Sequence, residues 1–283
     1  MTTILLGSIF LFGLIIGSFL NVVVLRWGEK TLGGRSGCMT CMRTLSWYEL
    51  VPVLSWILQR GKCRGCKDKI SCQYPLVELA TGLAFVFGSI AYFVVGDISL
   101  VFGLSTGVII GFIALLVALS MLVAIFVYDL KHQLIPDGWS LTFALASLVY
   151  SATIFTSAGA LWTKDFWWHL AAGPILFLPF YLLWKVSDGR WIGLGDGKLA
   201  VGIGWLLGLS LGLSAVVFSF WIGAIFAIIM IIIQKSFSKF SKEELTMKTA
   251  IAFGPFMIIA TLLVFWFGMN TLQFIDALGR ISF

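Results

Sequence analysis

Charged side chains are scarce in this sequence, and their scarcity excludes most classes of soluble protein. Of its 283 residues, 11% are charged and 60% are hydrophobic, whereas a soluble globular domain is close to one quarter charged. The mean hydropathy is +1.03. The composition therefore predicts a polytopic membrane protein that lies in a lipid bilayer.

A basic leader and a clear cleavage site are also absent from the first apolar segment. Residues 4–25 carry no charge and follow only Met-Thr-Thr, so we expect a retained membrane span rather than a removed signal peptide. Further apolar segments of roughly the 20-residue length that a bilayer requires follow at 74–95, 100–127, 139–156, 166–184, 199–213, 214–233 and 250–269. A tight hairpin is expected at 208–212, because the uncharged run 199–234 is too long for one helix. The expected fold is an all-α polytopic membrane protein with about eight transmembrane helices and a small cytoplasmic loop domain resembling a zinc ribbon.

The distribution of lysine and arginine predicts the orientation of these spans. With the N-terminus outside, 17 of the 19 basic residues fall on the cytoplasmic side, and only Lys164 and Arg280 fall outside. The net charge of +6 is therefore mostly a signal of topology, with basic loops near anionic lipid, and no nucleic-acid partner is expected. The same topology places Asp129 and Asp196 at one membrane face.

All five cysteines lie in the loop between the first two spans. Cys38-x-x-Cys41 and Cys63-x-x-Cys66 form a double CxxC pattern close to that of a four-cysteine zinc ribbon. Each pair lets two thiolates reach one tetrahedral ion, and disulfides are disfavoured in a cytoplasmic loop. These four cysteines therefore predict a structural zinc site, with a thiol-redox pair or free cysteines as the alternatives. Cys72 has no partner at this spacing, and we interpret it as a packing residue.

Two aspartates lie at the edges of apolar segments, where a carboxylate is costly to bury. Asp129 follows Tyr128 at the end of the third span, and Asp196 lies in Gly193-Leu194-Gly195-Asp196 at the start of the sixth. Paired carboxylates can share one proton, so that one acts as a base and the other as an acid, as in aspartic proteases. The pair therefore predicts a membrane-embedded aspartic peptidase with Asp129 and Asp196 as catalytic residues.

Structural roles for these acids remain as alternatives. Taken alone, Asp129 could be an interfacial anion beside Lys131, and Asp196 could belong to a capping turn at a helix start. Ile135-Pro136 is expected to end the third span, because the residue before a proline disfavours the helical region. Asp137 is then expected to cap the next helix.

Several stretches resemble, in order and spacing, the type IV prepilin peptidases, which are leader peptidase/N-methyltransferases. They are 17–23, the double CxxC loop, 52–56, 74–79, the two aspartate motifs and Ile135-Pro136-Asp137. Together they cover the chain to about residue 200. The first cysteine pair departs from the pattern, because Met39 stands where a proline is common, but all four thiolates remain.

The resemblance implies that Asp129 and Asp196 form the dyad of a peptidase that cleaves the basic leader of prepilins and pseudopilins after a glycine. This cleavage would occur at the cytoplasmic face of a bacterial inner membrane. The resemblance also implies methylation of the new N-terminal residue from S-adenosylmethionine, because the cysteine loop favours the bifunctional type. The sequence has no glycine-rich fingerprint for a nucleoside cofactor, and Glu78 and Gly82 are the candidates for methyl transfer. Glu78, about one turn into the second span, is equally well interpreted as a structural acid.

The sequence suggests three regions: a first transmembrane helix at 1–26, a cytoplasmic four-cysteine zinc-binding loop at 27–73, and a membrane-embedded peptidase domain at 74–283. The rival readings are a presenilin-like protease, which shares Tyr-Asp and Gly-x-Gly-Asp, and a proton-coupled transporter with intramembrane carboxylates. The cysteine loop and Ile135-Pro136-Asp137 argue against the first rival, and the transporter gives no reason for a zinc-ribbon loop. The oligomeric state is left open by the sequence.

Overall fold

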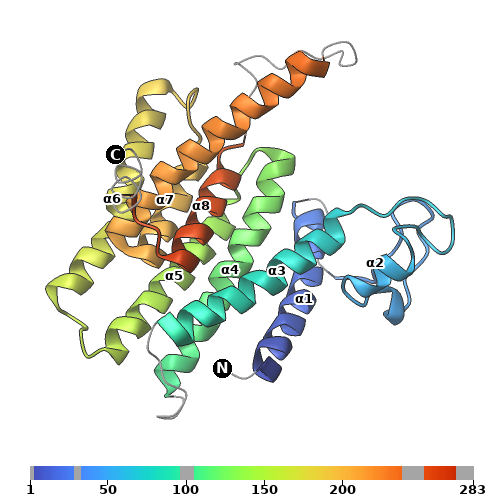
Figure 1. The fold of residues 1–283 in the computed structure, drawn as a ribbon, viewed down its shortest axis with the longest axis horizontal. Helices are drawn as coiled ribbons and strands as arrows, with labels where there is room; N and C mark the ends of the chain where they lie inside the picture. Colours follow the sequence, from blue (N-terminus) through green and yellow to red (C-terminus); the bar gives the residue numbers. More distant parts are fainter. Residues whose placement is uncertain (1–2, 29–32, 96–104, 238–251, 272–283) are drawn as a thin grey trace, which may run out of the picture. The chain divides into compact units, whose positions relative to one another are not determined.

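The computed structural model describes residues 3–28, 33–95, 105–237 and 252–271 of the chain, which are helical over most of their length (Figure 1). The elements are α1 (Thr3–Arg26), η1 (Trp47–Glu49), α2 (Leu54–Leu58), α3 (Gln73–Ile90), η2 (Ala91–Val95), α4 (Thr106–His132), α5 (Asp137–Ser157), α6 (Lys164–Ser187), α7 (Leu194–Phe237) and α8 (Gly254–Phe267). Within these ranges no strand ladder forms, and the β pairs are two isolated bridges in the cysteine loop. The predicted all-α class is confirmed.

Six helices of the described ranges are long and apolar enough to cross a membrane, namely α1, α3, α4, α5, α6 and α7. α8 is also apolar but has only 14 residues. α7 has 44 residues and contains a break, so that it accounts for two of the predicted spans. The predicted starts at residues 100 and 250 lie outside the described residues. The chain is therefore a multi-pass membrane protein, and eight is an approximate count of its spans.

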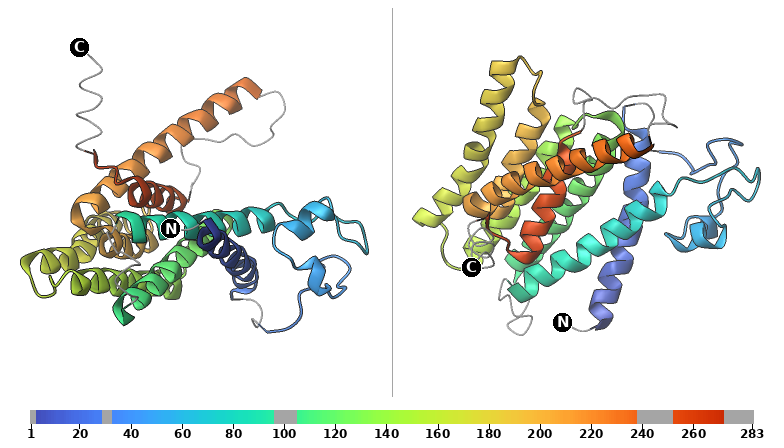
Figure 2. Two further views of the ribbon diagram at one scale, coloured as in Figure 1. Left: turned by 60° about the horizontal axis from the view of Figure 1, so that its bottom comes forward. Right: turned by 45° about the horizontal axis from the view of Figure 1, so that its top comes forward.

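The first of two compact units comprises Met1–Gly103 and Leu119–Val127, and it contains the pairing of α1 with α3. Gly13 and Gly17, one helical turn apart, let the two backbones approach: a Cβ added at either position would lie 2.7 Å from an α3 backbone atom. Small residues at this spacing are typical of helix pairs in membranes. The cysteine loop connects the C-terminal end of α1 to the N-terminal end of α3 (Figure 2).

The second unit comprises Leu104–Ala118 and Tyr128–Phe283, and α5, α6 and α8 all pack against α7. Glycine again permits the contact, since a Cβ added at Gly204 would lie 2.6 Å from the carbonyl oxygen of Ala172 in α6. Trp205 anchors the same pair of helices by donating its indole N–H to the Leu170 carbonyl at 2.8 Å. α7 is therefore the helix against which α5, α6 and α8 are assembled.

α7 breaks at Gly208, whose φ of 77° and ψ of −179° are accessible essentially to glycine alone. Beyond the break the chain turns back, because a Cβ added at Gly212 would lie 3.6 Å from the Cα of Gly204. The carbonyl of Trp205, near the end of the first half, accepts a hydrogen bond from Nε2 of His169 at 2.8 Å. The predicted reversal is thus present, and it occurs at the first residue of the expected hairpin.

We expect Gly208→Ala to lower the free energy of unfolding by about 2 kcal/mol, because alanine is strained at this φ and ψ. Its Cβ would also lie 3.0 Å from Nδ1 of His169. Unfolding of the purified chain in detergent measures the change. Gly7→Ala is the matched control, since a Cβ there would meet nothing within 4 Å, and it should leave stability equal or slightly higher. Equal stability of the two variants would contradict the requirement for glycine.

Candidate active site and metal centre

Asp129 lies in the last turn of α4 and Asp196 in the first turn of α7, the positions that the sequence predicts. Both belong to the second compact unit, and both are buried, with exposed fractions of 4% and 8%. α4 ends just beyond Asp129 because Gln133 takes a left-handed conformation, and its N–H bonds back to the Asp129 carbonyl at 2.8 Å. The end of one helix and the start of another thus each carry a buried carboxylate.

Gly254 and Ile135 lie between these two helix ends. The Gly254 backbone N–H, at the start of α8, bonds to the Asp129 carboxylate. The Ile135 side chain lies against two glycines, since a Cβ added at Gly254 or at Gly195 would each be 3.1 Å from it. Gly195 directly precedes Asp196. The second unit therefore brings both carboxylates around the same apolar side chain.

Neither carboxylate forms an ion pair with another residue that the structure describes. Lys198, the basic residue closest to Asp196 along α7, instead pairs with Asp137 at 2.6 Å. The charge of Asp129 acts on Asp196, whose Oδ2 atom lies beside Gly193, 3.5 Å from the position of a Cβ added at that glycine. Two buried carboxyl groups that interact in this way are most stable when they share one proton, because two close negative charges repel. Such a pair can act as a base and as an acid.

Two interpretations made from the sequence are wrong. Asp137 is the first residue of α5 rather than its cap, because Pro136 occupies the N-cap position without a side-chain hydrogen bond. Helix boundaries inferred from sequence commonly shift by one or two residues, and the exposed Asp137 carboxylate is free to pair with Lys198. Cys72 is not a packing residue, because it is exposed at the residue preceding α3.

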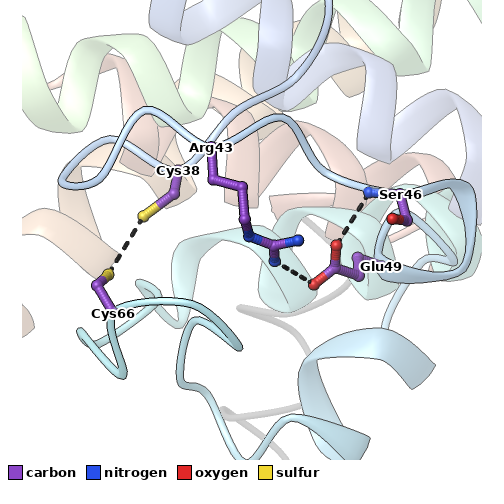
Figure 3. Close-up of polar contacts among 5 residues, drawn as sticks. All are labelled: Cys38, Arg43, Ser46, Glu49 and Cys66. Carbon is purple, nitrogen blue, oxygen red and sulfur yellow. Dashed lines mark hydrogen bonds and ion pairs between the residues drawn. The ribbon is translucent and has the colours of Figure 1, made fainter.

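The four predicted ligand cysteines converge within the first unit. The Sγ atoms of Cys38, Cys41, Cys63 and Cys66 all lie within 4.8 Å of one another, and those of Cys38 and Cys66 are 3.8 Å apart (Figure 3). A tetrahedral zinc ion with bonds of about 2.3 Å places its sulfur ligands about 3.8 Å apart. The donor set and its spacing therefore fit a metal ion, and none of these cysteines forms a disulfide.

The two CxxC turns have the same backbone pattern. Cys38 and Cys63 each donate their N–H to the carbonyl five residues ahead, at 3.0 and 2.8 Å. Four residues after each of these cysteines the backbone takes a positive φ, 57° at Met42 and 63° at Lys67. One isolated β bridge closes each turn. The repeated turn gives both halves of the cluster the same geometry, as two halves of one tetrahedral site require.

The turns also favour ionised sulfur at one position and disfavour it at another. The backbone N–H groups of Cys66 and Gly65 lower the pKa of the Cys63 thiol to about 6. At Cys66 the Asp68 N–H acts in the same direction, but desolvation and the neighbouring sulfurs raise the pKa of this exposed thiol to about 11. A divalent cation among the four sulfurs would remove this repulsion, because it stabilises every thiolate at once.

Buried Glu49 fixes the segment that follows the first CxxC turn (Figure 3). Its carboxylate accepts hydrogen bonds from Nη2 of Arg43 at 2.7 Å and from the Ser46 backbone N–H at 2.9 Å. The Arg43 guanidinium lowers the pKa of Glu49, so the acid stays ionised and the pair is charge-assisted. The loop thus has an ion pair of its own beside the sulfur cluster.

Glu78 and Gly82, the candidates for methyl transfer, are both occupied by protein neighbours. The buried Glu78 carboxylate accepts the Val53 backbone N–H at 2.7 Å. Val53 has a φ of 59° and a ψ of −53°, which are strained for a β-branched residue, so this bond supports a tight turn before α2. Gly82 lies against α1, where a Cβ would be 2.8 Å from the Phe10 ring. Neither residue presents an open cradle for a cofactor.

Two family models match the chain. The Bacterial Peptidase A24 N-terminal domain matches residues 11–92, which include the four-cysteine loop, and the Type IV leader peptidase family matches residues 116–228, which include both buried aspartates. The chain belongs to the type IV leader peptidase family. It is therefore an enzyme, and a peptidase.

Curated relatives match most of the length of the chain. The chain is 34% identical to the prepilin leader peptidase/N-methyltransferase of Myxococcus xanthus, over 80% of the chain and 64% of the relative. It is 32% identical to the protein of the same name from Stutzerimonas stutzeri, over 88% of the chain and 86% of the relative. It is 27% identical to the protein of the same name from Bacillus subtilis, over 95% of the chain and 97% of the relative. No solved structure matches the chain.

Reasoning from the sequence did not assign two neighbours of the aspartates to the site. Ile135 was recognisable only as the residue before a proline, and Gly254 was one glycine in an apolar segment. The available signal for Gly254 is the Gly254-Pro255 pair, because proline is favoured in the first turn of a helix and its preceding residue then lies at the helix start. The candidate site thus includes a glycine far along the chain from either aspartate motif.

We expect Gly254→Ala to lower peptidase activity by roughly 100-fold while the protein remains folded. The added Cβ would lie 2.5 Å from Oδ2 of Asp129, so the carboxylate must move. Initial rates per folded enzyme, with unfolding measured in parallel, check this expectation. Gly138→Ala, whose Cβ would meet nothing within 4 Å, is the control that should keep its activity. Full activity of the Gly254 variant would show that this close contact is irrelevant to the chemistry.

Proposed function

We propose that this chain removes the leader of type IV prepilins and pseudopilins and N-methylates the new N-terminal residue with S-adenosylmethionine as methyl donor. The observation that carries the proposal is the pair of buried carboxylates, Asp129 and Asp196, without an ion-pair partner among the described residues. The names of the relatives, prepilin leader peptidase/N-methyltransferase, support the substrate class and the second reaction.

The cleavage is proposed to occur after a glycine at the cytoplasmic face of a bacterial inner membrane. The lysine and arginine distribution supports this sidedness, because basic residues concentrate in cytoplasmic loops. On the same grounds we propose that the cysteine loop and the two aspartates lie on one side of the membrane. We further propose three functional regions: a membrane anchor at 1–26, the zinc-binding loop at 27–73 and the peptidase domain at 74–283.

In the proposed mechanism a water molecule lies between the two carboxyl groups. The ionised aspartate removes a proton from the water, and the resulting hydroxide adds to the carbonyl carbon of the scissile bond. The protonated aspartate gives its proton to the carbonyl oxygen, which yields a tetrahedral diol. Collapse of the diol breaks the carbon–nitrogen bond as a proton passes to the leaving amine. Because each carboxyl group serves as both donor and acceptor during the cycle, Asp129 and Asp196 titrate as one unit.

For methyl transfer we propose that Glu78 and Gly82 act as positioning residues. S-adenosylmethionine supplies the methyl group to the free amine that cleavage exposes. Glu78 holds the cysteine loop on α3 through Val53, and Gly82 allows α1 to approach α3. We propose that a zinc ion bound by Cys38, Cys41, Cys63 and Cys66 stabilises the same loop, because a segment this small has little core of its own.

Asp129→Asn and Asp196→Asn should each reduce cleavage by about 10³-fold or more, because an amide can neither accept the proton of the water nor donate one in return. The test is mass spectrometry of a prepilin incubated with the enzyme in a bilayer. Lys198→Gln, which changes the exposed partner of Asp137, is the control and should retain cleavage. Substantial processing by either asparagine variant would eliminate the dyad, and proton-coupled flux without any cleavage would favour the transporter.

Cys63→Ser should remove the bound zinc and methyl transfer while cleavage falls by only a few fold, because the loop and the aspartates belong to different compact units. Zinc per chain is measured by elemental analysis, and methyl transfer by the added mass on the cleaved prepilin. Cys72→Ser removes an exposed thiol outside the cluster and should retain both the metal and methylation. Equal loss of both reactions in the Cys63 variant would instead make the loop part of the peptidase.

A further inference from the structure

The short helix α2 turns an apolar face outward. Leu54, Ile57 and Leu58 expose 58%, 59% and 70% of their surface. Trp56, on the other side of the same helix, packs inward and donates its indole N–H to the Ile70 carbonyl at 3.2 Å. Three large aliphatic side chains on one exposed turn are costly in water, and such a patch marks a contact surface.

Four cations lie directly beside this face. Leu58 borders a hollow of about 630 Å³ that Arg60, Lys62, Arg64 and Lys67 also line. All four basic side chains are exposed, and none of them pairs with a carboxylate in the part of the chain that the structure describes. The hollow therefore carries four cations that form no ion pair among the described residues, next to exposed hydrocarbon.

The loop is held beside the bilayer by its own attachments. α1 ends at Arg26 and α3 begins at Gln73, and both helices are candidate membrane spans. Within α3, Glu78 accepts the N–H of Val53, the residue immediately before α2. Because Glu78 lies only about one turn into a membrane span, this bond fixes the start of α2 near the depth at which α3 enters the bilayer.

We propose that Leu54, Ile57, Leu58, Arg60, Lys62, Arg64 and Lys67 form a docking surface for an anionic lipid bilayer. In this arrangement the aliphatic side chains of α2 insert between lipid headgroups, and the cations of the hollow bind lipid phosphates. Exposed apolar residues flanked by lysine and arginine are typical of segments that lie in a membrane interface. A protein partner would have to present both hydrocarbon and clustered acid, whereas the bilayer beside the loop already presents both. Docking would hold the cysteine cluster against the membrane surface, and it does not depend on the proposed function.

Hydrogen exchange of the intact chain in lipid nanodiscs tests the docking surface. Backbone amides of residues 54–62 should exchange roughly tenfold more slowly in phosphatidylglycerol-containing discs than in pure phosphatidylcholine discs, because cations near an anionic leaflet are attracted to it. The difference should shrink as salt is added. The double variant Lys62→Gln/Lys67→Gln should abolish the slowing of exchange. The control is Lys131→Gln/Lys185→Gln, which removes two exposed lysines elsewhere and should keep the slowing.

Bound metal per chain verifies that the loop of each variant is folded. Leu54→Ser/Ile57→Ser provides a second test, since it alters only exposed apolar residues, leaves every cation in place and should also lose the protection.

Equal exchange in the two bilayers, or slowing that persists in the lysine variant, would overturn the proposal. Protection by inorganic phosphate in phosphatidylcholine discs would indicate a free-anion site instead. Protection that appears only on adding a prepilin would indicate a protein-binding surface.

Discussion

The burial of two carboxyl groups without a balancing cation among the described residues is the constraint on which the candidate active site depends. Asp129 lies at the C-terminal end of α4, where the helix dipole disfavours an anion. The N-terminus of α8 offsets this by directing the Gly254 N–H at the carboxylate. Asp196 lies at the N-terminal end of α7, where the dipole favours it. Two helix starts thus favour the two buried carboxylates.

Glycine also recurs at several of the close contacts that the structure describes. Gly254 must approach a carboxylate, Gly195 must accommodate Ile135, and Gly204 must approach the backbone of α6. Lipid provides little hydrophobic drive for helices to associate, so close backbone contact and polar groups take its place. In the four-cysteine loop the close groups are thiolates, which would repel one another. A metal ion can neutralise them.

The sequence predicted the features that depend on local chemistry. A proline after Ile135 located the end of the third span, and the CxxC spacing located four sulfurs that do converge. It could not predict contacts between distant segments. The approach of Gly254 to Asp129 depends on how α8 packs, and the bond from Val53 to Glu78 depends on a strained turn that no residue pattern signals. Errors at Asp137 and Cys72 were local, because exposure and helix boundaries at a single residue are decided by the surrounding structure.

The pH dependence of kcat/KM on a prepilin substrate tests most directly the claim that the two aspartates share one proton. A shared proton predicts a bell-shaped profile, in which gain of one proton inactivates the enzyme on the acid side and loss of one proton inactivates it on the alkaline side. The profile should be the same in Cys72→Ser, which removes an exposed thiol of the other compact unit. If kcat/KM instead falls on only one side and stays level on the other, only one carboxyl group takes part in proton transfer. This result would contradict a proton shared by the two aspartates.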